Sequence, residues 1–71
     1  MNNGSKLGQI MRERGITSKW LAMATGIPKN TISRLRQRQD ALDSAAALTV
    51  LSISCALHVP LRDILSIEDL Y

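Results

Sequence analysis

The 71-residue sequence has few of the side chains on which disulfide-rich and metal-binding domains depend, since it contains one Cys and one His. Aromatic residues are also scarce, with one Trp, one Tyr and no Phe. A single Cys cannot form an internal disulfide, and one Cys with one His cannot build a structural zinc site. No apolar run approaches the roughly 20 residues that a membrane span needs, and the start MNNGSK lacks the apolar core of a signal peptide. We expect a soluble cytoplasmic protein with no metal and no membrane partner.

Arrangements of residues that support catalysis are also missing. No His is paired with a nucleophile, no pair of carboxylates shares an apolar setting, and no Gly-rich loop could cradle a phosphate. The length allows one small domain over residues 1–71, which leaves little buried volume for a deep active site. We predict that the chain is not an enzyme and that it uses no cofactor and no small-molecule substrate.

The modest net charge of +3 conceals a strong division along the chain. Residues 1–39 contain eight Lys and Arg residues against Glu13 alone, a net charge of +7. Residues 40–71 contain Arg62 against five acidic residues, a net charge of −4. A basic region beside an acidic one is typical of domains that bind a polyanion, although Lys and Arg can also be merely solvated.

Helix-ending signals are frequent, and no apolar–polar alternation is long enough for a strand. A first helix is expected over about residues 5–14, closed by Gly15 in the left-handed conformation. Thr17 is the expected N-cap of a second helix over residues 18–25, which Gly26 ends. The sequence therefore predicts an all-α domain.

The third expected helix runs from residue 28 or 29 to residue 36 or beyond, with Ile32 and Leu35 as a narrow buried stripe. Two short helices joined by a tight turn that contains Gly are typical of a helix-turn-helix. The spacing i, i+3, i+4, i+7 places four polar residues on one face of this helix: Asn30, Ser33, Arg34 and Gln37. Amide, hydroxyl and guanidinium groups are those that read base edges in the major groove.

The rest of the chain is apolar and mildly acidic. A fourth helix is expected from Asp40 or Asp43 to about Leu57, and a short fifth helix from Pro60 to about Leu65. The fourth is apolar nearly all round, which predicts burial against several neighbours or across a dimer. Residues 66–71 form a tail.

Three isolated residues allow only less specific predictions of their role. Cys55 is expected to be a small buried apolar residue rather than a redox sensor. His58 is expected in a loop, where it tolerates a left-handed backbone better than most residues. Trp20 is expected to cover Met23 and Lys19, with stacking on a partner or on a sugar-phosphate backbone as the alternatives.

The segment ITSKWLAMATGIPKNTISRLR, residues 16–36, closely resembles the lambda-repressor-like (Cro- or Xre-type) helix-turn-helix family. The residues that carry the likeness are Leu21-Ala22, Gly26-Ile27, Ile32-Ser33 and Leu35. It extends back through Leu7, Ile10, Arg14 and Gly15, and forward through Ala56-Leu57 and Ile64-Leu65, so it covers about residues 6–65. The resemblance implies a compact five-helix domain. The connection after the third helix is about three residues longer than in the family, so the third helix runs further or the fourth begins earlier.

The resemblance also implies that the third helix enters the major groove of double-stranded DNA. By the family pattern, base contacts fall on Lys29, Asn30, Ser33 and Arg34. Phosphate contacts fall on Ser18, Lys19, Thr31, Gln37 and Arg38.

One such module buries only about 600–1,000 Å² on DNA, so we expect a homodimer on a two-fold operator. The fifth helix and the tail are the expected interface, with contributions from Ile67, Leu70 and Tyr71. The function predicted is that of a small phage- or plasmid-type Cro-like repressor. The alternatives are an antitoxin or a restriction-system controller of the same fold, or a protein-interaction module that does not read DNA.

Overall fold

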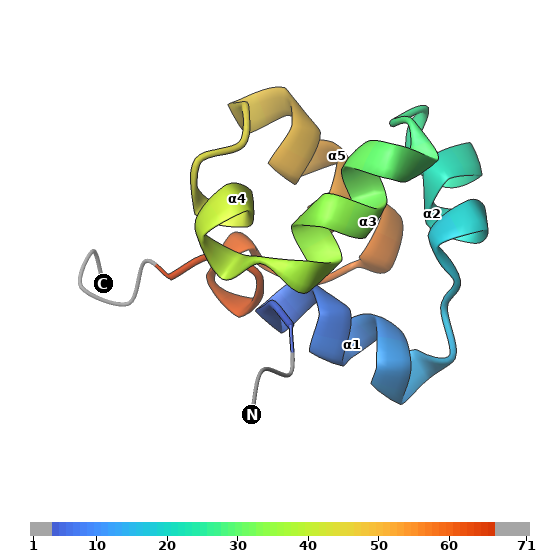
Figure 1. Ribbon diagram of the computed structural model, residues 1–71, viewed down its shortest axis with the longest axis horizontal. Helices are drawn as coiled ribbons and strands as arrows, with labels where there is room; N and C mark the ends of the chain where they lie inside the picture. The colour runs from blue at the N-terminus through green and yellow to red at the C-terminus, as the bar shows by residue number, and fades with distance from the viewer. Residues whose placement is uncertain (1–3, 67–71) are drawn as a thin grey trace.

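The computed structural model describes residues 4–66, which contain five α-helices and one 3₁₀ turn (Figure 1). In chain order these are α1 (Lys6–Arg14), α2 (Ser18–Thr25), α3 (Lys29–Gln37), α4 (Gln39–Asp43), α5 (Ala47–Leu57) and η1 (Leu61–Asp63). No strand occurs in this part of the chain, so the all-α prediction is confirmed.

Capping residues set the ends of α1 and α2 as predicted. The Thr17 hydroxyl accepts a hydrogen bond from the Trp20 amide at 3.0 Å, and Gly26 closes α2 with φ of 78°. Gly15 closes α1 with φ of 68°. These positive φ angles are the left-handed conformation that glycine adopts without a steric penalty.

The helices enclose one apolar core to which every α-helix contributes. α3 packs against α1, α2 and α4, so it is the central helix of the basic half (Figure 1). The buried apolar residues are Leu7, Met11, Leu21, Ile32, Leu35, Leu42, Val50, Ile53, Leu57, Val59 and Ile64.

The end of α3 is held directly by the beginning of α1. The Ser5 amide donates to the Arg36 carbonyl at 2.9 Å. A Cβ on Gly8 would lie 2.3 Å from the same oxygen, which is closer than real side chains approach. Gly8 is therefore required because the backbone of α3 occupies the space of a side chain.

The predicted fourth helix is wrong in one respect, because the chain divides it into α4 and α5. The Ser44 amide still bonds to the Asp40 carbonyl at 3.1 Å, but Ala46 is extended, with ψ of 145°. A continuous helix over residues 39–57 would be about 28 Å long. The break lets the chain turn back so that α5 packs against α2. α4 takes up the extra residues after α3.

The C-terminal part is also shorter than predicted, because the expected fifth helix is the single turn η1 followed by irregular chain to Ser66. Gln39 connects it to the rest of the molecule. Its side-chain oxygen accepts from the Lys6 amide at 2.8 Å, and its nitrogen donates to the Ile64 carbonyl at 2.9 Å. The beginning of α1, α4 and the C-terminal segment thus meet at one amide.

Two of the isolated residues can be placed. His58 has φ of 57° and closes α5, as its predicted tolerance of this conformation requires. The prediction that Cys55 is buried is wrong, because its thiol lies on the exposed side of α5. A helix that is apolar on all sides carries no signal for which side faces the core. None of the helices among residues 4–66 has the length and hydropathy of a membrane span.

Candidate nucleic-acid interface

A three-residue turn, residues 26–28, joins α2 to α3. The Thr25 hydroxyl donates to the Leu21 carbonyl at 2.8 Å and accepts from the Ile27 amide at 3.2 Å. The Gly26 amide bonds to the Ala22 carbonyl at 2.8 Å. These bonds fix the turn, so the predicted helix-turn-helix is present and its second helix has a defined direction.

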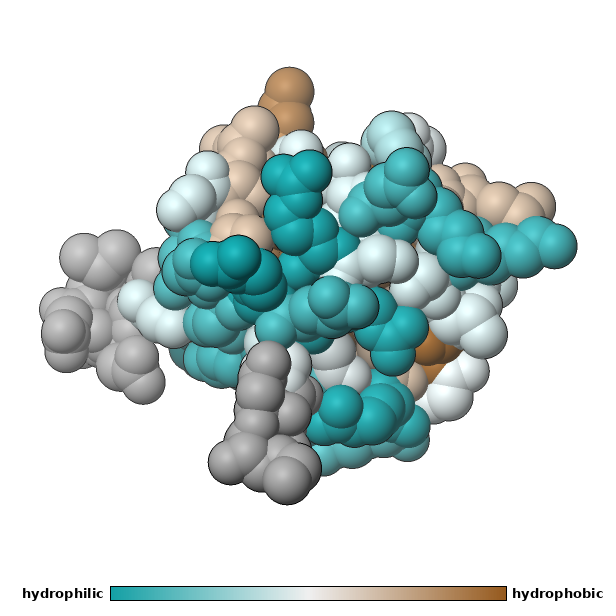
Figure 2. Space-filling model, in the orientation of Figure 1, coloured by the Kyte–Doolittle hydropathy of each residue, from teal (hydrophilic) through white to brown (hydrophobic). Residues whose placement is uncertain are grey.

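Only two residues anchor α3 to the core. Ile32 is fully buried and Leu35 is 3% exposed, and the other side chains of α3 are polar or basic. Figure 2 shows a mostly hydrophilic surface over α3 and its surroundings. The predicted base-reading residues are Lys29, Asn30 and Arg34, which are exposed, and Ser33, which is half-buried.

The basic side chains of the first 39 residues divide into those with internal partners and those without. The Lys6 ammonium donates to the carbonyls of Arg62 and Leu65, and Arg14 donates to the Leu57 carbonyl at 2.7 Å. Such contacts stabilise the fold and do not need a ligand. Three cations have no hydrogen bond or ion pair within residues 4–66, and all three were predicted to contact DNA: Lys19, Lys29 and Arg34.

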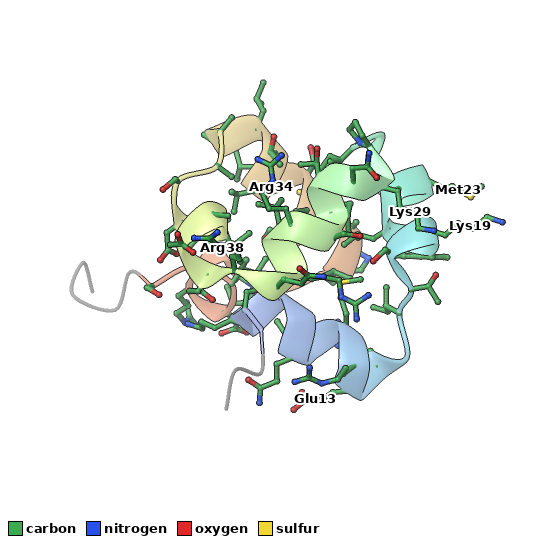
Figure 3. The ribbon with its side chains drawn as sticks, in the orientation of Figure 1. Glu13, Lys19, Met23, Lys29, Arg34 and Arg38 are labelled. Carbon is green, nitrogen blue, oxygen red and sulfur yellow. The ribbon has the colours of Figure 1, made fainter. Side chains whose placement is uncertain are left out.

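A hollow of about 500 Å³ lies where α1 ends and α2 begins, beside α3. Its lining includes four basic residues from three helices and no acidic residue: Arg12, Lys19, Lys29 and Arg36. Lys19 and Lys29 lie near each other on this side of the molecule (Figure 3). The Thr17 cap satisfies the Trp20 amide but leaves the first two amides of α2 without a helical partner. Cations and free amides together favour an anion such as phosphate.

Arg36 also lines this hollow, although it is not one of the phosphate contacts that the family pattern implies. Its guanidinium donates to the Ser18 hydroxyl at 2.9 Å and so connects α3 to the first residue of α2. It lies seven residues after Lys29, two turns along the same side of α3, and this spacing is the sequence signal that would have found it. Ser18 itself is 7% exposed, so its hydroxyl serves this internal bond.

A second hollow, of about 320 Å³, lies on the other side of α3. Thr31 and Arg34 line it from α3, and Ser44 and Thr49 line it from the segment around the start of α5. No side chain caps α5, since the residue before it is Ala46. The polar groups here are therefore hydroxyls, helix-terminal amides and one guanidinium.

The two hollows are on opposite sides of the predicted reading face. At about 100° per residue, Lys29 and Arg36 lie to one side of α3, and Thr31 to the other. Between them come, in angular order, Ser33, Gln37, Asn30 and Arg34. One polar face with a hollow on each side suits a helix that lies in a groove between two phosphate backbones.

Arg38, predicted to contact phosphate, has an internal partner. Its guanidinium forms a bidentate pair with Asp40, with Nη2 2.9 Å from Oδ2. This hydrogen-bonded pair raises the pKa of Arg38 and lowers the pKa of Asp40. Both side chains are well exposed, so the pair holds Arg38 weakly.

Comparison with known proteins agrees with this geometry. The family model of the Cro/C1-type HTH DNA-binding domain matches residues 6–69. The chain belongs to this family. Comparison with curated proteins and with solved structures gives no significant match.

Membership of the Cro/C1-type family makes double-stranded DNA the partner of this domain. The match begins at Lys6, where α1 begins, and runs past the end of the described residues. The predicted dimer residues Ile67, Leu70 and Tyr71 lie outside the described residues. Within residues 4–66, no group of three or more His, Cys, Asp or Glu residues could hold a metal ion.

Proposed function

We propose that this protein is a sequence-specific transcriptional regulator of the Cro type, which acts as a repressor in the cytoplasm by occupying its operator. The observation that carries the proposal is the exposed polar face of α3 with a hollow suited to phosphate on each side. DNA binding follows from the family, whereas the repressor role and the residues in contact are proposed.

In the proposed complex, Asn30, Ser33 and Arg34 face the base edges. Arg matches guanine through two donors, Asn matches adenine through its amide, and Ser can serve either base. Lys29 stands at the edge of this face, where it can reach a base or a phosphate.

Phosphates of the two strands would occupy the flanking hollows. On one side Lys19, Arg12 and Arg36 meet the first phosphate together with the free amides of α2. On the other side the hydroxyl of Thr31 and the start of α5 meet the second. Arg36 also fixes α2 against α3 through Ser18, so the reading face and this phosphate site keep one relative position.

A dimer on a two-fold operator follows from size. One module covers only about 600–1,000 Å² of contact, which is small for specific binding at cellular salt. Two copies would place their α3 helices in successive major grooves, about 34 Å apart.

The test is the binding of the full chain to a random-sequence DNA duplex at several salt concentrations. Each phosphate contact contributes about 0.9 to the slope of log affinity against log salt, so we expect a slope of about −3 or steeper per chain. Met23→Gln is the control, because Met23 is 77% exposed on α2 and takes no part in the proposed contacts. Absence of DNA binding, or affinity that does not change with salt, would support a protein-interaction module instead.

A further inference from the structure

α5 has an apolar side that stays exposed among the described residues, 4–66. Its inner side buries Val50, Ile53 and Leu57. On the opposite side Leu48 is 78% exposed and Leu51 is 43% exposed, and both share a helix face with exposed Cys55. We call Leu48, Leu51 and Cys55 the α5 stripe. Figure 2 shows a strongly hydrophobic projection over the first turn of α5, at the top of the view.

An apolar hollow of about 270 Å³ lies beside the α5 stripe. Leu51 belongs to both, and the remaining lining is Asp43, Ala45, Ala47, Val50, Leu61 and Leu65. A cavity of about 150 Å³ accepts a benzene-sized group, so this hollow has room for a leucine side chain. A projecting Leu48 and a hollow that could receive it therefore lie side by side on one surface.

A projection and a hollow on the same surface are what a two-fold contact between identical chains needs. In such a contact residue i of one copy meets residue j of the other, and j meets i in return. The two-fold axis also brings every charge near it close to the same charge of the second copy. α5 has no charged residue along its whole length. DNA, in contrast, would need cations on this face.

We propose that the α5 stripe is the surface by which two copies of this chain associate, with Leu48 of each inserted into the apolar hollow of the other. The proposal rests on the proposed function in that a two-fold operator requires a dimer. It places the contact on α5, whereas the sequence analysis placed it on the tail.

Asp43 at the rim of the hollow gives the proposal a direct test. Its carboxylate accepts from the Ser66 amide and from Gln39, both at 3.0 Å. Burial alone raises the pKa of Asp43, but these hydrogen bonds outweigh it and lower the pKa below its ordinary value. Asp43 is therefore charged at neutral pH. In the proposed dimer, the residue at position 48 of one copy points toward Asp43 of the other.

The experiment is sedimentation equilibrium on the full chain and three variants without DNA: Leu48→Glu, Leu48→Lys and Met23→Glu. Leu48→Glu removes the apolar contact twice per dimer and faces Asp43, so its dimer dissociation constant should rise by about 100-fold or more. Leu48→Lys removes the same contact but faces an opposite charge, so its dimer dissociation constant should rise about tenfold less than that of Leu48→Glu. Met23→Glu alters an equally exposed apolar residue on α2 and should leave the dimer unchanged.

A monomeric wild-type chain, or a Leu48→Glu variant that dimerises as well as wild type, would overturn the proposal. An equal rise of the dimer dissociation constant in Leu48→Glu and Leu48→Lys would contradict the insertion of Leu48 beside Asp43. Because Leu48 is on the surface, circular dichroism should show all three variants folded. Leu48 lies in the first turn of α5, where the second phosphate is proposed to bind, so the DNA measurement uses the wild-type chain alone, which should bind a duplex with a single half-site. Loss of that binding in the wild-type chain would contradict the proposed function and leave the dimer surface standing.

Discussion

α3 and α5 are helices of similar length that use their outer sides in opposite ways. α3 buries two residues and presents amides, hydroxyls and cations to the solvent, whereas α5 buries three and presents leucines. Neither outer side is buried among residues 4–66. The polar side is suited to DNA and the apolar side to a second protein chain, so the chemistry of an exposed helix face indicates the class of its partner.

The largest difference is expected in the free energy of unfolding, between a substitution on the inner side of α3 and one on the outer side of α5. Ile32→Ala should lower the free energy of unfolding by about 2–5 kcal/mol, because it leaves a cavity under α3. That is much of the stability of a small domain, about 5 kcal/mol. Leu48→Ala, on the exposed side of α5, should change it by less than about 0.5 kcal/mol in the monomer. Urea unfolding of both variants, monitored by circular dichroism at a monomeric concentration, measures the difference, and equal losses would contradict the assignment of sides.

The outer side of α3 should carry sequence preference independently of stability. Arg34→Ala should cost about 1–3 kcal/mol on a preferred duplex and much less on random DNA, with unchanged thermal unfolding. Fluorescence anisotropy with the two duplexes gives the ratio. Equal losses on both would assign Arg34 to phosphate instead of bases.

Cations with and without internal partners should respond differently to removal. Lys19→Ala should weaken binding to all DNA and reduce the salt slope by about 1, because Lys19 has no partner within residues 4–66. Lys6→Ala is the matched control, since its ammonium already bonds to the Arg62 and Leu65 carbonyls. It should lower stability and leave the slope unchanged. A smaller salt slope in both variants would mean that an internal partner does not keep a cation from contacting DNA.

The smallest effect is expected at the Arg38–Asp40 pair. The pair lowers the pKa of Asp40, so its contribution is present at neutral pH and lost as the pH falls through the lowered value. Both side chains are well exposed, so this contribution is too small to measure, and the thermal midpoint of Asp40→Asn should match that of wild type from pH 7 to pH 3. It should slightly increase affinity for random DNA, because Arg38 is released. A clear loss of thermal stability would show that the pair matters to the fold.

Local chemistry made the DNA-binding part predictable. α2 begins after its N-cap Thr17, and α1 and α2 end at Gly15 and Gly26. These caps act through bonds within a few residues, so the boundaries follow from the sequence. The single apolar stripe of α3 likewise defines its outer side. The roles of its residues in DNA contact stay predictions.

Tertiary contacts made the second half unpredictable. No Pro or Gly separates α4 from α5, and Leu42, Val50 and Ile53 would share one face of a continuous helix. The chain bends there because Gln39 and Asp43 hold the C-terminal segment while α5 packs on α2. Cys55 was misplaced for a related reason, since an all-apolar helix has no polar side to mark the solvent.

The most direct test of the account is selection of preferred sequences from a randomised pool of DNA duplexes with the full chain. Wild type should enrich an inverted repeat whose half-sites are centred about 10 base pairs, or 34 Å, apart. Arg34→Ala should enrich the same spacing with a relaxed preference at one position in each half-site. Recovery of the unselected pool, or the same sequence from both proteins, would contradict the assignment of α3 as the helix that reads DNA.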